Sequence, residues 1–161
     1  MKPLYHGTIY EFEEIDVSVG KGYKDFGKGF YATSDLLHAE RIAIRNKKIA
    51  EKRQSFLKNK KGIKLQPIIA YRYNLLFSEN VSTLNVKVFE EADKEWLRFI
   101  IRNRKYDGCT HDFDIVIGPT ADAETTMIIN DYYDELEETG YSDIVCDKII
   151  HKLKPENLSK Q

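Results

Sequence analysis

A glycine-rich loop that runs directly into a β-prone segment and a helix start constrains this chain more than any other feature. Residues 21–29 contain three glycines and three lysines, residues 30–33 read Phe-Tyr-Ala-Thr, and Ser34 is a typical helix N-cap. Because glycine allows positive φ and a close approach of main-chain N–H groups, such a loop can wrap an anionic or planar small molecule. A mobile hairpin turn explains the same spacing equally well.

Two nucleotide-binding motifs have a similar spacing, and both are excluded. Gly22, Gly27 and Lys28 match the first part of a phosphate-binding P-loop, but Gly29 stands where the metal-binding Ser or Thr is required. A β-prone segment follows Lys28 instead of the helix whose N-terminus would hold the phosphate. The glycines do not have the spacing of a dinucleotide-binding fingerprint either.

Two short motifs lie in the first 31 residues, namely His6-Gly7-Thr8 and the segment 27–31. They resemble the first two signatures of the ADP-ribosyltransferase superfamily, in the branch with a His, Tyr, Glu triad, which contains diphtheria toxin and the poly(ADP-ribose) polymerases. Residues 25–39, 95–99 and 114–122 resemble more closely a bacterial domain family of unknown function assigned to that superfamily. The resemblance covers nearly the whole chain. It implies an α+β fold with a single ADP-ribosyltransferase-like domain over residues 1–161, built from a split β core with surrounding helices.

The same resemblance implies a binding site for NAD, which would be the substrate. His6 would hydrogen-bond a ribose hydroxyl, the main chain of Gly7 would hold the nicotinamide amide, and Tyr31 would stack on the nicotinamide ring. The remaining residues assigned to this cofactor site are Thr8, Phe26, Gly29, Thr33 and Ile42.

The third signature of the superfamily is a Glu or Gln at the start of a late strand. Residues 153–159 resemble the lead-in to that strand, so Gln161 is the candidate for the third catalytic residue, with its strand missing. Glu124, which follows Gly118-Pro119, is the alternative carboxylate, and it also fits an exposed residue in the first turn of a helix. Either group would stabilise the positive charge of an oxocarbenium-like transition state.

The resemblance implies a mono-ADP-ribosyltransferase that acts on a macromolecular target, or an NAD glycohydrolase, of a toxin-like or effector-like kind. A non-catalytic module that binds NAD or ADP-ribose is the alternative, and an interaction protein that uses a basic helix over residues 41–64 is a further one. That helix segment contains ten Lys or Arg and one acid, whereas residues 106–147 contain twelve acids and no Lys or Arg. Such asymmetry can steer a charged partner, or it can reflect two solvated faces.

Composition limits the remaining function classes. The net charge of −1 argues against a chain that binds nucleic acid through its overall charge, so a protein acceptor is favoured. No apolar run is long enough for a signal peptide or a membrane span, so we expect a cytoplasmic protein without membrane contact, with export by a route without a cleaved signal still open. His111, Asp112 and Asp114 suggest a metal site only superficially, because alternate strand residues face opposite ways, and no metal is expected.

Apolar spacing predicts the secondary structure. We expect a first strand over residues 2–5 that delivers His6 at its end, and an extended segment in which Tyr10, Phe12, Ile15 and Val17 pack under the glycine loop. Further strands are expected over 67–76, 84–88 and 113–117, with a turn at 78–80. Helices are expected from Ser34 to about residue 58 and over 90–104, 123–138 and 142–153, with Asp122 as an N-cap and Gly140 between the last two.

Overall fold

The computed structural model describes residues 3–61, 66–76, 83–105, 107 and 111–153. The chain has a mixed α+β fold and divides into two compact units. Unit 1 comprises residues 1–16 and 30–82, and unit 2 comprises residues 17–29 and 83–161. The glycine-rich loop therefore belongs to unit 2, whereas the segment after it belongs to unit 1. The single domain over residues 1–161 stays a prediction.

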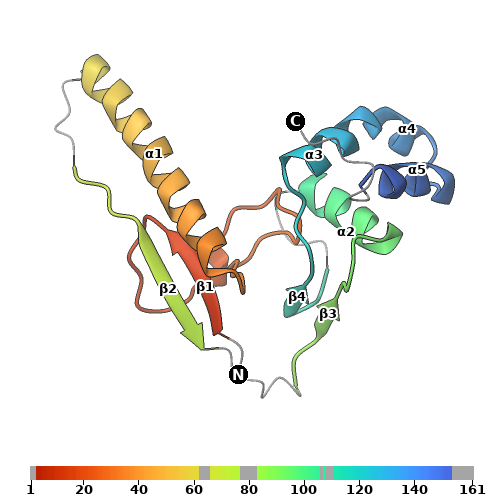
Figure 1. The fold of residues 1–161 in the computed structure, drawn as a ribbon, viewed down its shortest axis with the longest axis horizontal. Coiled ribbons are helices and arrows are strands. Elements are labelled where there is room, and N and C mark those ends of the chain that lie inside the picture. Colours follow the sequence, from red (N-terminus) through yellow and green to blue (C-terminus); the bar gives the residue numbers. More distant parts are fainter. Residues whose placement is uncertain (1–2, 62–65, 77–82, 106, 108–110, 154–161) are drawn as a thin grey trace. The chain divides into compact units, whose positions relative to one another are not determined.

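Unit 1 consists of a two-stranded sheet with one long helix (Figure 1). Strand β1 (Pro3–Thr8) pairs antiparallel with β2 (Tyr71–Leu76), with His6 opposite Tyr73. Helix α1 (Leu36–Lys61) lies beside both strands. Residues 30–33 add one antiparallel bridge, in which Tyr5 and Thr33 exchange N–H···O bonds of 2.8 and 2.9 Å.

Gly7 allows α1 to approach β1 very closely. A Cβ atom added to Gly7 would lie 1.9 Å from the carbonyl oxygen of Ala39 and 3.1 Å from the main-chain nitrogen of Ala43. Ala39 and Ala43 are themselves buried, so small residues line both sides of this contact. Because glycine has no Cβ atom, Gly7 allows α1 to pack directly against the backbone of β1.

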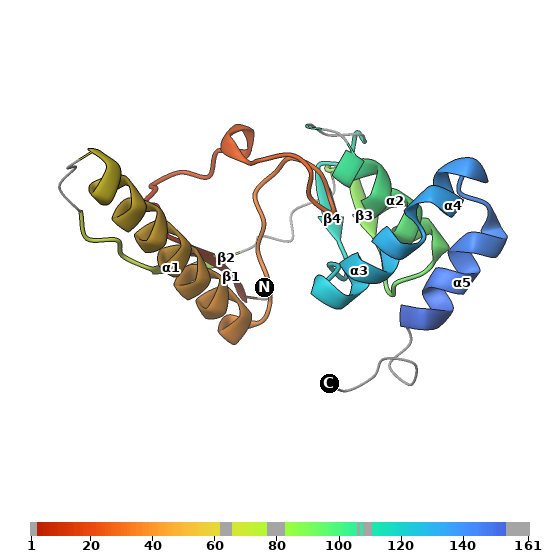
Figure 2. The same ribbon diagram turned by 90° about the horizontal axis from the view of Figure 1, so that it is seen from above.

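In its described residues, unit 2 combines a parallel strand pair with four helices (Figure 2). Strand β3 (Val86–Val88) pairs in parallel with β4 (Ile115–Ile117), and α2 (Lys94–Lys105) lies between them in sequence, as the crossover of a parallel pair requires. The other helices are α3 (Ala123–Asp131), α4 (Tyr133–Glu138) and α5 (Asp143–Leu153). A 3-10 turn, η1 (Val17–Val19), precedes the glycine loop.

The apolar core of unit 2 is built around α2. Trp96 and Leu97 are almost fully buried, and the Trp96 indole N–H donates a 2.7 Å hydrogen bond to the carbonyl oxygen of Pro119. Helices α3, α4 and α5 contribute Ile129, Leu136, Val145, Cys146 and Ile149 to the same cluster. Burial raises the pKa of the Cys146 thiol, so this cysteine behaves as a small apolar residue.

Several expected helix boundaries are confirmed and others are wrong. Asp122 caps α3 through its 2.7 Å bond from the N–H of Thr125, and Gly140 has φ 61° between α4 and α5, both as expected. The N-cap of α1 is Asp35 and not Ser34, because Asp35 accepts the N–H of His38 at 3.1 Å. The helix expected over 123–138 is interrupted at Tyr132, which separates α3 from α4.

The expected strands differ in extent and pairing. Strand β1 continues through Thr8, so His6 lies within the strand and not at its end. The turn expected at 78–80 lies outside the described residues, and β3 pairs with β4 instead of β2. Tyr10, Ile15 and Val17 are between half and three-quarters exposed, so the prediction that they pack under the glycine loop is wrong.

Candidate functional site

The structure brings His6 and Tyr31 together. The Nδ1 atom of His6 lies 2.7 Å from the main-chain oxygen of Tyr31. The bridge between Tyr5 and Thr33 places residues 30–33 beside β1, which is why two residues 25 positions apart meet. His6 and Tyr31, one residue from each of the two motifs, therefore lie together within unit 1.

This bond fixes which nitrogen of the His6 ring carries the proton. A carbonyl oxygen only accepts hydrogen bonds, so Nδ1 must be the donor. In the neutral imidazole, Nε2 is then an acceptor, and the described residues provide no hydrogen bond to it. His6 can therefore accept a hydrogen bond from a hydroxyl group of a ligand.

An aromatic cluster holds the His6 ring in place. The ring lies 4.3 Å from Phe30 and 5.8 Å from Phe12, measured between ring centroids. Phe12 in turn packs 4.1 Å from Tyr73, whose hydroxyl accepts the N–H of Phe12 at 3.1 Å. Tyr73 stands opposite His6 in the register, so the two side chains lie on the same face of the sheet. Phe12, Phe30 and Tyr73 were not predicted for this site, although the alternation of residues 69–75 indicates the strand face on which Tyr73 lies.

The main chain of Gly7 faces the same edge of β1 as residues 30–33. Tyr5 uses both of its main-chain groups to bond Thr33, and groups two residues apart point to the same edge of a strand. The N–H and C=O of Gly7 therefore also point to this edge. Within the described residues, Gly7 forms no hydrogen bond with the segment 30–33. The ladder stops after one bridge, which leaves a donor and an acceptor side by side.

Three further residues predicted for the NAD site lie in unit 1, and they differ in burial and in hydrogen bonding. Thr8 is 7% exposed, and its hydroxyl accepts the N–H of Tyr10 at 3.2 Å. Thr33 is half-buried at the bridge to Tyr5, where its hydroxyl also accepts the N–H of Asp35. Ile42 is exposed on α1.

Phe26 and Gly29 belong to unit 2, where the glycine loop has its own packing partners. The Phe26 ring packs against Phe99, and its carbonyl oxygen accepts a 3.1 Å bond from Nε2 of His111. Gly20 packs directly on the backbone of Gly29, because an added Cβ at Gly20 would lie 2.5 Å from the Gly29 oxygen. In this loop, partial burial and then repulsion from Lys21 lower the pKa of Lys24.

A partly buried ion pair, which no local sequence pattern indicates, anchors the same loop. Asp25 is 7% exposed and lies 2.5 Å from Nε of Arg104 on α2. Its second carboxylate oxygen accepts the N–H of Ala121 at 2.8 Å, and Arg104 also donates to the hydroxyl of Thr126. Asp25 therefore joins the loop to α2 and to the start of α3.

The structure describes one of the two catalytic candidates. Glu124 is exposed in the first turn of α3, in unit 2. Gln161 lies outside the described residues. Asp122, which precedes Glu124, serves as the helix cap, and the N–H of Thr125 holds the pKa of its carboxyl below the usual value.

In the parts of the chain that the structure describes, no group of three or more His, Cys, Asp or Glu side chains is arranged to hold a metal ion. Asp114 accepts the N–H of Asn85 at 2.8 Å, and His111 bonds main-chain groups of Phe26 and Phe113. Both residues thus have local structural partners. Of the helices in the described ranges, none combines the length and the apolarity that crossing a membrane requires.

One comparison with known proteins gives a match. The sequence model of a family described as protein of unknown function, DUF3990, matches residues 2–161. No curated protein and no solved structure matches the chain.

Proposed function

Because the chain belongs to the DUF3990 family, whose description assigns no activity, we propose a function from its own site. The chain binds NAD at the edge of β1 and transfers ADP-ribose from it to a macromolecular acceptor, for which a protein is favoured, or to water. The resemblance of the His6 and Tyr31 motifs to ADP-ribosyltransferases supplies the reaction class, and the geometry of unit 1 supports the binding step.

The main chain of Gly7, which is buried in β1 next to His6 and forms no hydrogen bond with residues 30–33, is the observation that carries the proposal. A carboxamide such as that of nicotinamide offers one acceptor and N–H donors, which complement the N–H and C=O of a strand edge. Gly7 has both groups on the edge where the ladder with residues 30–33 stops. The acceptor nitrogen of His6, on the adjacent residue, suits a ribose hydroxyl.

Tyr31 supplies the stacking surface in this proposal. Its main chain is held at the edge of β1 by the 2.7 Å bond to His6. An aromatic ring stacked on a heterocycle contributes about 1–3 kcal/mol of binding free energy. Removal of the Tyr31 ring therefore weakens binding without removing the bond to His6.

The reaction breaks the bond between the ribose carbon and the nicotinamide nitrogen. Nicotinamide leaves with the bonding electron pair and becomes neutral, while the ribose carbon passes through an oxocarbenium-like state. A nucleophile on the acceptor, or a water molecule, then forms the new bond and releases a proton. Gln161 or Glu124 is the candidate group that stabilises the transient positive charge.

Release of nicotinamide from NAD tests the proposal. Wild-type protein should release nicotinamide, and Tyr31→Phe should retain the activity because it keeps the ring. Tyr31→Ala should lose at least about tenfold in kcat/KM, as expected for a lost stacking contact. Tyr10→Ala is the matched control, since Tyr10 is 72% exposed. If NAD binds and nicotinamide release is absent in the wild type, the transfer step of the proposal is wrong.

A binding module for NAD or ADP-ribose is the second candidate function. It requires only a binding surface, and His6 and Tyr31 lie together within unit 1. This alternative predicts binding of ADP-ribose as tight as that of NAD and no nicotinamide release. Equal losses of affinity for both ligands in His6→Asn would support it.

A further inference from the structure

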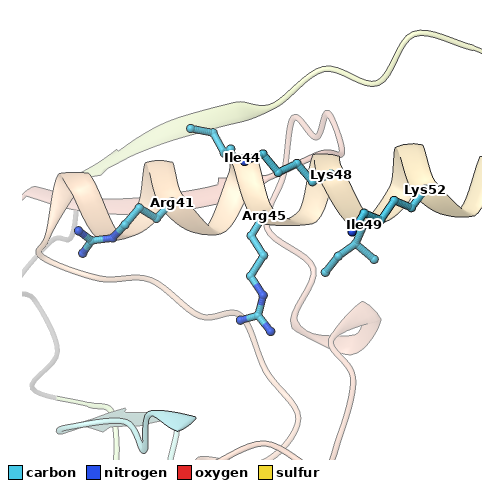
Figure 3. Close-up of a pocket in the computed structure, with 6 residues that line it drawn as sticks. All are labelled: Arg41, Ile44, Arg45, Lys48, Ile49 and Lys52. Carbon is cyan, nitrogen blue, oxygen red and sulfur yellow. The ribbon is translucent and has the colours of Figure 1, made fainter. Parts of the chain in front are cut away.

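A row of four cations runs along α1, and Figure 3 shows all four with two isoleucines around a hollow on that helix. Arg41, Arg45, Lys48 and Lys52 are spaced by four, three and four residues, so they occupy successive turns of one face. We call these four residues the basic row. Ile44 and Ile49 are the other residues that line the hollow, and their side chains are 49% and 39% exposed.

The basic row lies on the side of α1 that faces away from the sheet. Residues along a helix advance by about 100° each, which places the row on the opposite side of the axis from the buried Ala39 and Ala43. The same geometry places Ile44 on one flank of the row and Ile49 on the other. The outermost line of this face is therefore cationic, with an apolar side chain on each flank.

The row is not neutralised within the described structure. Arg41 has one ion pair, a 3.6 Å contact with Asp35 at the start of the helix. Arg45, Lys48 and Lys52 form no ion pair with a described residue, whereas Lys47, off this face, pairs with Glu51 at 3.8 Å. Like charges at three- and four-residue spacing destabilise a helix, so the row opposes the folding of α1 on its own. An anionic partner would convert this repulsion into attraction.

We propose that the basic row is a docking surface for an acidic helical segment of a partner protein. Carboxylates repeating at three- and four-residue spacing match the spacing of the four cations. Aliphatic side chains beside those carboxylates would cover Ile44 and Ile49, which are exposed without a partner. The proposal concerns the outer face of α1 and does not depend on NAD binding.

Two other anionic partners fit the arrangement less well. Helices that lie on a membrane place apolar residues at the centre of the buried face and cations at its borders, which is the reverse of the order on α1. Single-stranded nucleic acids stack bases on aromatic side chains, and the row is flanked by isoleucines. Charge complementarity together with apolar flanks thus favours a protein segment.

The test is a binding titration of the full chain with a synthetic helical peptide that carries four Glu at the spacing of the row, flanked by Leu. We expect binding to the wild type and at least about tenfold weaker binding to the double variant Arg45→Glu/Lys48→Glu, since charge reversal converts attraction into repulsion. The charge-matched control is Arg53→Glu/Lys58→Glu, which changes two cations of α1 outside the row and should alter the affinity by less than about threefold. Ile44→Ser/Ile49→Ser should weaken binding several-fold and make the remainder more sensitive to salt.

Four results would overturn the proposal. They are the absence of peptide binding by the wild type, equal losses in the two charge variants, tighter binding of a single-stranded oligonucleotide than of the peptide, and tighter binding of vesicles that contain anionic lipid. A fifth such result would come from sedimentation of the chain alone, which measures self-association. If the wild type self-associates and Arg45→Glu/Lys48→Glu does not, the occupant of this face is a second copy of the chain.

Discussion

The Nδ1 atom of His6 donates a hydrogen bond of 2.7 Å to the main-chain oxygen of Tyr31. This bond gives His6 two separate roles that different substitutions can distinguish. Nδ1 holds the segment 30–33 against β1, and Nε2 remains an acceptor for a ligand.

The structural role of His6 can be isolated with an asparagine. The amide nitrogen of Asn is as many bonds from Cα as Nδ1 of His, so His6→Asn can still donate to the Tyr31 oxygen, whereas His6→Ala cannot. We expect His6→Ala to lower the free energy of unfolding by about 1 kcal/mol more than His6→Asn, the usual value of a lost hydrogen bond. Urea unfolding of both variants measures this difference. Equal stability of the two would mean that the bond does not hold residues 30–33.

Gly7 and Gly29 form a matched pair for a test of packing. Gly7→Ala places a methyl group 1.9 Å from the carbonyl oxygen of Ala39, which is main chain and cannot rotate away, so we expect a loss of about 2 kcal/mol or more. A Cβ at Gly29 meets no atom within 4 Å, and Gly29→Ala should change stability by less than about 0.5 kcal/mol. Thermal or urea unfolding of the two variants measures these changes in stability. A Gly7→Ala variant as stable as Gly29→Ala would contradict the close contact of α1 with β1.

The ion pair of Asp25 with Arg104 should be important for the stability of unit 2. Asp25→Ala leaves the guanidinium of Arg104 with reduced compensation and removes the acceptor for the N–H of Ala121, so we expect a loss of about 3 kcal/mol. The double variant Asp25→Ala/Arg104→Ala should lose less unfolding free energy than the sum of the losses in the two single variants, because each single variant already breaks the same ion pair. Chemical unfolding of the three variants gives the coupling. Strict additivity would show that the two residues act independently.

Asp122 gives a pH dependence of known sign. Its folded-state pKa is lowered from 3.8, first by the N–H of Thr125, so the cap stabilises the fold at neutral pH and is lost as the pH falls through the lowered pKa. Asp122→Ala should therefore cost about 1 kcal/mol at pH 7. The difference in the free energy of unfolding between wild type and Asp122→Ala should decrease as the pH falls. Urea unfolding of both proteins from pH 7 to the lowest pH at which they fold measures this difference. An increase of the difference in acid would contradict the lowered pKa of Asp122.

Local signals in the sequence predict much of this fold. The apolar spacing of residues 36–56 predicts α1, Asp122 predicts the start of α3, and Gly140 predicts the separation of α4 from α5. Each signal depends on neighbours within a few residues, where helix geometry and capping dominate. The α+β class follows from the same local patterns.

Pairing between distant residues could not be predicted in the same way. Asp25 and Arg104 are 79 positions apart, and no local pattern links them. The parallel pairing of β3 with β4 depends on the α2 crossover, and no local pattern links residues 86–88 with residues 115–117. For the site, the two motifs predicted His6 and Tyr31, but the Phe12, Phe30 and Tyr73 rings around His6 follow only from the packed sheet.

Calorimetric titration of the whole chain with NAD, performed on the wild type, His6→Asn and His38→Asn, tests the NAD site most directly. His38 is exposed on α1 and serves as the matched histidine control. We expect that wild type and His38→Asn bind alike, and that His6→Asn loses about 1–3 kcal/mol of binding free energy because the acceptor at Nε2 is gone while the bond to Tyr31 is kept. Absence of NAD binding by the wild type, or equal binding by all three proteins, would contradict the assignment of the β1 edge as the NAD site.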